Sequence, residues 1–116
     1  MPEQEMVIFT RTFDLLSWLL PASNHFPRAH RHSFTARLLG SAFDLQEHLL
    51  LADHRRGQAR WHELQAADES LDRLRIYLRL AARWGWLSTG QYGHVSAMVA
   101  FGPKPHSWGA PVSGGL

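Results

Sequence analysis

The chain has 116 residues, which is enough for one domain with a single hydrophobic core and too few for two. An apolar fraction of 45% and a charged fraction of 19% are typical of a globular chain and exclude extensive disorder. The complete lack of cysteine excludes disulfides, thiolate metal sites and cysteine nucleophiles. The formal net charge is only +2, yet every cation except Lys104 is an arginine.

The N-terminal residues have neither the charge nor the hydropathy of a secretory leader. Glu3 and Glu5 stand where a leader carries cations, and no long apolar stretch follows them. No apolar run approaches the roughly eighteen residues of a membrane span. We therefore expect a soluble, cytoplasmic protein without a membrane partner.

Helical spacing begins near the N-terminus, after a short lead-in. A first helix is expected from Phe9 to about Phe26, and Pro21 should kink it or end it near Leu20. Phe26-Pro27 then predicts a connector, because the residue before a proline avoids the helical region. Phe13, Leu16 and Leu20 repeat at the spacing of a helix.

Two longer helices follow, at about residues 31–53 and 59–84. One face of the first is formed by Phe34, Leu38, Ser41, Leu45, His48, Leu49 and Ala52. The second has the three–four spacing of a bundle seam at Leu64, Ala67, Leu71, Leu74, Leu78 and Ala81. Gly85 suits its C-terminal end.

A fourth helix is expected to begin after Ser88 or Thr89 and to stop before Gly102-Pro103. Residues 102–116 are rich in glycine and proline and predict an irregular tail. With no strand pattern and no repeat, the sequence predicts an all-α protein. Its fold is an antiparallel, up-and-down four-helix bundle over residues 1–101.

The second and third helices each carry a second apolar stripe opposite the core stripe. In a bundle of only four helices, a helix can hardly bury two opposite apolar stripes at once. The second stripe therefore predicts an interface with another copy of the chain or with a partner protein. A wide core stripe with scattered surface apolar residues is the simpler alternative. On the third helix this second stripe also includes Trp84 and Leu87. The candidate interface residues are Leu39, Phe43, Leu50, Ile76 and Leu80.

Arginine is concentrated on the third helix and in the first connector. Guanidinium groups bind phosphate in a bidentate manner and stack on bases, so a ridge of them suits nucleic acid. The alternative is a solvated charged face, in which Arg75 pairs with Asp72 and Arg73 with Glu69. The arginines in question are Arg73, Arg75, Arg79 and Arg83 on the helix and Arg28 and Arg31 in the connector.

The motifs of catalysis and of metal binding are missing from the sequence. Asp44 and His48 are four residues apart, but no second pair completes a di-iron site, and His62-Glu63 lacks the second histidine of a zinc helix. No phosphate-binding loop, dinucleotide fingerprint or nucleophile elbow is present. We expect a binding and assembly protein with no catalytic residue, metal or cofactor, in which His48 is a boundary histidine.

Four stretches resemble a known family. They are residues 13–21 (FDLLSWLLP), 25–31 (HFPRAHR), 71–81 (LDRLRIYLRLA) and 87–92 (LSTGQY). In order and spacing they are similar to the accessory variability determinant (Avd) proteins of diversity-generating retroelements, over about residues 9–100. A sibling group comprises the four-helix-bundle proteins encoded in intervening sequences of bacterial large-subunit ribosomal RNA genes.

The resemblance implies a barrel-shaped homopentamer that is not itself catalytic. Such proteins associate with the reverse transcriptase of the retroelement and bind RNA or DNA through a basic surface during mutagenic copying. It also implies that the six arginines named above bind nucleic acid. The sibling group implies the alternative, a self-associating structural bundle without a polymerase partner. Residues 101–105 (FGPKP) depart from the family pattern and predict a short fourth helix.

Overall fold

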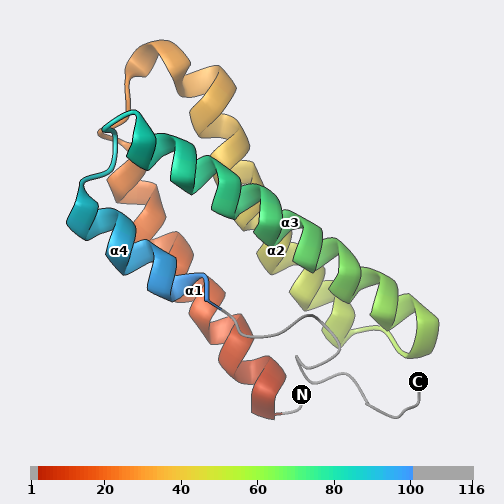
Figure 1. Ribbon diagram of the computed structural model, residues 1–116. Coiled ribbons are helices and arrows are strands. Elements are labelled where there is room, and N and C mark those ends of the chain that lie inside the picture. The colour runs from red at the N-terminus through yellow and green to blue at the C-terminus, as the bar shows by residue number, and fades with distance from the viewer. Residues whose placement is uncertain (1–2, 101–116) are drawn as a thin grey trace.

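Four α-helices form the protein, whose computed structural model describes residues 3–100. They are α1 (Glu3–Ser23), α2 (Ala36–Asp53), α3 (Gly57–Arg83) and α4 (Thr89–Met98). Each packs on the next along the chain, and α4 returns to contact α1 (Figure 1). The described residues contain no strand, so the expected all-α, four-helix architecture is confirmed.

The core follows the predicted seam of α3. Every one of its six seam positions is buried, with at most 1% of the surface exposed. The face predicted for the second helix is buried at Leu38, Ser41, Leu45, Leu49 and Ala52. His48 on the same face and Phe34, which lies just before α2, are half-buried. The burial of these positions confirms the core faces that helical spacing predicted for α2 and α3. Leucines of α1 and Val95 of α4 complete the core.

Helix α1 differs from its predicted form. It begins at Glu3, six residues before the expected start, and its buried stripe runs through Ile8, Thr12, Leu15 and Leu19. Of the three residues whose spacing predicted this helix, Leu16 is buried, whereas Phe13 and Leu20 are 54% and 42% exposed. Apolar residues surround more than half of this helix, so spacing alone does not select the face that α2 and α4 cover.

Pro21 does not end α1 near Leu20, because the helix continues to Ser23. Only half a turn remains after the proline, so few backbone bonds are affected by its missing N–H. The Ser23 hydroxyl donates to the Leu20 carbonyl at 3.0 Å, and the Phe26 amide donates to the Ser23 carbonyl at 3.0 Å. These bonds satisfy the end of the helix beyond the proline.

The connector begins at Phe26-Pro27 as predicted, with Pro27 in an extended conformation. A 3-10 turn, η1 (Arg28–His30), and a π turn, η2 (Arg31–Thr35), then lead directly into α2. The helical turns expected from residue 31 are therefore present, but the first of them is wider than an α-helical turn.

Capping motifs at the turn between α3 and α4 end the first helix and begin the second. Gly85 has a φ of 81°, and the amides of Gly85 and Trp86 donate to the carbonyls of Ala82 and Ala81. This pair of bonds is a Schellman motif, which requires a left-handed residue at that position. Ser88 then caps α4 through a reciprocal capping box with Gln91, as its position predicted.

Helix α4 covers only part of the bundle. It has 10 residues against 27 in α3, and it ends at Met98, before the Gly-Pro pair. The ring of Trp18 on α1 contacts the ring of His94 on α4, with centroids 5.4 Å apart. Within the described residues no helix is long and apolar enough to cross a membrane. The predicted tail, residues 102–116, lies outside the described part of the chain.

Candidate nucleic-acid interface

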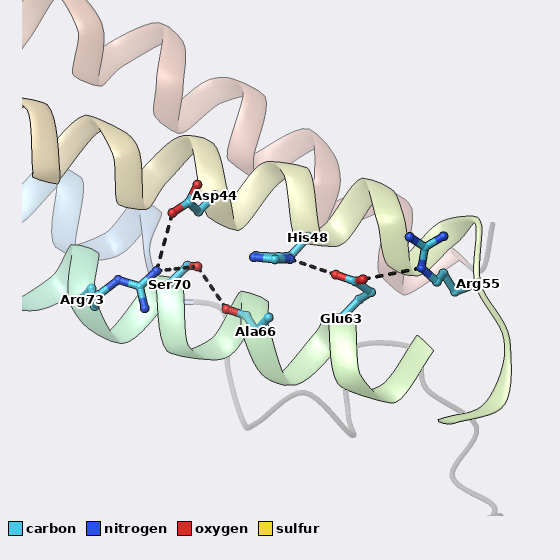
Figure 2. Close-up of polar contacts among 7 residues, drawn as sticks. All are labelled: Asp44, His48, Arg55, Glu63, Ala66, Ser70 and Arg73. Carbon is cyan, nitrogen blue, oxygen red and sulfur yellow. Dashed lines mark hydrogen bonds and ion pairs between the residues drawn. The ribbon is translucent and has the colours of Figure 1, made fainter. Parts of the chain in front are cut away.

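A polar cluster joins the C-terminal half of α2 and the turn after it to the first half of α3 (Figure 2). His48 Nδ1 lies 2.8 Å from Glu63 Oε1, and the other oxygen of this carboxylate lies 3.5 Å from Arg55 Nε. Glu63 is well shielded from solvent, so its carboxylate needs partners within the protein. His48 satisfies one of its oxygens and Arg55 the other. The expected boundary position of His48 is confirmed, and the cluster fixes the register between the two helices.

Arg73 also bridges these two helices. Its Nη2 lies 3.6 Å from Asp44 Oδ2 on α2 and donates to Ser70 Oγ at 3.1 Å (Figure 2). The predicted pairing of Arg73 with Glu69 is therefore wrong. The Arg73 guanidinium is bonded instead to Asp44, across the interface with α2, and to the buried Ser70, one turn earlier on α3.

Arg75 turns toward the other neighbour of α3. Its guanidinium donates to the Val99 carbonyl at the C-terminal end of α4 and lies 3.9 Å from Asp72 Oδ1. The predicted Asp72 partner is confirmed. A cation at a helix C-terminus satisfies an orphan carbonyl and the negative end of the helix dipole, so Arg75 fastens α4 to α3.

The other four candidate arginines are exposed. Arg79 and Arg83 lie on the last two turns of α3, Arg28 lies in η1, and Arg31 lies in η2. Within residues 3–100 their guanidinium groups make no ion pair and no hydrogen bond. The predicted set thus divides into two structural arginines and four that are available to an anionic ligand.

At the opposite end of the bundle two of the three arginines, Arg55 and Arg60, are bonded to other groups of the protein, while Arg56 is exposed. Arg60 Nη1 donates to the Ala52 carbonyl at 3.2 Å, near the end of α2. Partial burial lowers the pKa of this guanidinium from its ordinary value through desolvation. Arg55 is paired with Glu63, as described above. This end therefore offers less unpaired positive charge than the surface around Arg79 and Arg83.

The predicted interface residues also fall into two groups. Phe43 and Leu50 on α2 and Ile76 on α3 are exposed, whereas Leu39 and Leu80 are half-buried, and Leu39 packs against the core. Exposed apolar positions that the sequence analysis did not single out as interface are Val7, Phe13 and Leu20.

Leu87 does not share the outer stripe of α3. It is 2% exposed, because the chain turns back at Gly85 and carries this side chain into the core. Trp84, in contrast, is 48% exposed, as its predicted position implied.

Sequence reasoning missed a cluster of aromatic rings beside the arginines. Trp84 and Trp86 have ring centroids 4.9 Å apart, and Phe34 from η2 lies 5.2 Å from Trp84 and 5.3 Å from Trp86. His30 stacks on Trp86 at 5.4 Å with an interplanar angle of 20°. The Trp-Gly-Trp sequence around the turn was the available signal.

The described residues contain no group of three or more His, Asp or Glu side chains that could hold a metal ion. Helical architecture, surface arginines and exposed apolar side chains together define a basic four-helix-bundle protein.

Comparison with known families matches residues 6–102 to the family described as bAvd-like, and the chain belongs to this family of Avd-type proteins. Among curated proteins and solved structures, no match was found.

Proposed function

We propose that this protein is the non-catalytic accessory subunit of a diversity-generating retroelement. In this role it forms a cytoplasmic homo-oligomer, a pentameric barrel, that binds the reverse transcriptase together with template RNA or its cDNA. Membership of the bAvd-like family over residues 6–102 is the observation that carries this proposal.

The arrangement of the arginines supports a nucleic-acid role. Arg28, Arg31, Arg79 and Arg83 are exposed and have no intramolecular partner in the described part of the chain, so phosphate oxygens can reach their donors. Repetition of the chain around an oligomer multiplies this charge, which raises the local concentration of a polyanion.

The exposed apolar side chains support self-association. Phe43 and Leu50 lie two turns apart on α2, and Ile76 is 55% exposed on α3. A monomer of this size leaves these positions in water, whereas an interface between copies removes them from it. They are the residues that we assign to contacts between subunits, together with the exposed edges of Leu39 and Leu80.

The oligomer and its polymerase contact are tested together by light scattering and co-purification. We expect the purified chain to scatter with about five times the 13.2 kDa mass of one chain, and to retain the reverse transcriptase of a diversity-generating retroelement when the two are co-expressed. A monomer would contradict the scaffold. A pentamer that never retains the polymerase would favour the self-associating structural bundle instead.

The arginine role is tested by a double substitution, Arg79→Glu with Arg83→Glu. Because both side chains are exposed and make no hydrogen bond or ion pair within the described residues, the variant should keep its helicity and mass. Nucleic-acid affinity should fall by at least about tenfold at low salt, because each reversed charge removes a phosphate contact and adds repulsion. Unchanged affinity across a salt series would show that these arginines form only a solvated face.

A further inference from the structure

Acidic residues are segregated along the chain. All ten of them lie within residues 3–14 and 44–72. The segments 15–43 and 73–100 contain no Asp or Glu, but they hold Arg28, Arg31, Arg37, Arg73, Arg75, Arg79 and Arg83. The fold brings the two segments to one end of the molecule, where α1 connects to α2 and α3 connects to α4 (Figure 1). We call this part of the molecule the basic end.

Two ion pairs mark the boundary of the basic end. Asp44 faces Arg73 at 3.6 Å, and Asp72 faces Arg75 at 3.9 Å. Arg83 is eleven residues beyond Asp72 on the same helix, about 16 Å along its axis. That separation exceeds the screening length of about 8 Å at physiological salt, so the boundary carboxylates do little to neutralise the outer arginines.

An exposed indole stands among these arginines. Trp84 directly follows Arg83 in the chain, and its ring is held by Phe34 and Trp86. Nearly half of its surface, 48%, nevertheless stays open to solvent. A large aromatic ring that is fixed by other rings and left accessible is suited to stacking, because little side-chain entropy is lost when a second ring packs on it.

We propose that the basic end binds single-stranded nucleic acid, with an unpaired base stacked on Trp84 and the flanking phosphates held by Arg83, Arg28 and Arg31. The inference rests on the proposed nucleic-acid role and deepens it by naming the form of the ligand. In a duplex the base faces are covered by neighbouring base pairs, so only the phosphate contacts remain available. A ring beside a basic surface therefore favours a single strand over a duplex.

Fluorescence anisotropy with the full chain tests the proposal. The probes are a labelled oligo(dT) strand of about twenty nucleotides and a labelled duplex of equal length. We expect tighter binding of the single strand. Trp84→Ala should weaken it by about five- to a hundredfold while leaving duplex affinity and the salt slope unchanged. Trp84→Phe should restore most of the affinity, because a phenyl ring still stacks.

Matched controls separate stacking from charge and from general surface changes. Phe13→Ala removes an equally exposed aromatic ring from α1, outside the basic end, and should leave binding unchanged. Arg83→Gln should reduce the slope of log affinity against log salt by about 0.7, the value for one phosphate contact on a single strand. Arg56→Gln, at the exposed turn between α2 and α3, should leave the slope as it is.

The outcomes distinguish this inference from the function on which it rests. If the unaltered chain binds neither probe, the nucleic-acid role itself fails. If it binds both probes and Trp84→Ala binds the single strand equally well, only the stacking site fails. A change in the light-scattering mass of Trp84→Ala would also overturn the site, because the indole would then lie between copies of the chain.

A second measurement avoids dependence on the folding of a variant. A single strand carrying 5-bromouracil is irradiated in complex with the unaltered protein, and the crosslinked peptide is mapped. We expect the crosslink at Trp84. A crosslink confined to residues 44–72, outside the basic end, would overturn the proposal even if Trp84→Ala did not fold.

Discussion

At the scale of single residues, chemically identical arginines have different tasks because of what lies opposite them. Arg73 and Arg75 contact groups on α2 and α4, so their donors are already used by the fold. Arg79 and Arg83 are one and two turns further along α3, beyond the end of these contacts, and their donors remain free within the described chain. Arg75, Arg79 and Arg83 recur every four residues along the helix, and this spacing by itself does not separate the two tasks.

A pair of alanine substitutions checks this division. Arg75→Ala should lower the free energy of unfolding by about 1 kcal/mol, because it leaves the Val99 carbonyl without its charged donor. Arg79→Ala should change it by less than about 0.5 kcal/mol, as expected for an exposed side chain that makes no hydrogen bond or ion pair within the described residues. Urea unfolding followed by circular dichroism measures both. Equal effects would show that the contact of Arg75 with α4 contributes nothing to stability.

At the scale of elements, the ends of helices are better specified than their faces. The Schellman turn at Gly85 and the capping box at Ser88 are local devices, and the sequence reveals both of them. The face of α1 is not local, since it depends on which side α2 and α4 cover. This is why Phe13 and Leu20 lie outside while Leu15 and Leu19 lie inside.

Two glycine-to-alanine substitutions test the turn against a matched helical position. Gly85→Ala should destabilise the protein by about 1–2 kcal/mol, because its φ of 81° is unfavourable for any residue with a Cβ. Gly40→Ala, within α2 and with no atom near the added Cβ, should stabilise it by about 0.5–1 kcal/mol. Thermal melting should therefore move in opposite directions, and shifts of the same sign would contradict this assignment.

At the scale of the whole molecule, the four helices do not cover all of one another's apolar side chains. Helix α4 spans less than half of α3, and apolar side chains of α1, α2 and α3 stay in contact with water. The two ends also differ in charge, with carboxylates among the arginines at the α2–α3 turn and none at the basic end. A molecule with uncovered apolar side chains and two ends of different charge is suited to be a subunit of an assembly.

The assembly contacts are tested by placing charge on α2. Phe43→Glu with Leu50→Glu should reduce the scattering mass toward that of one chain while the helical signal persists, because both side chains are exposed in the single chain. Glu47→Gln, an exposed substitution on the same helix, serves as the control and should leave the mass unchanged. A double variant of unaltered mass would place the subunit contacts elsewhere.

The sequence by itself determined the helical class, the seam of α3, the buried face of α2 and the caps of the turn between α3 and α4. These features follow from periodicity and from local hydrogen bonding, which act over a few residues. Only the tertiary structure decided which face of α1 is buried, which arginines are already bonded, and that two acid-free segments share one end. Those properties depend on residues far apart in the chain, and packing alone brings them together.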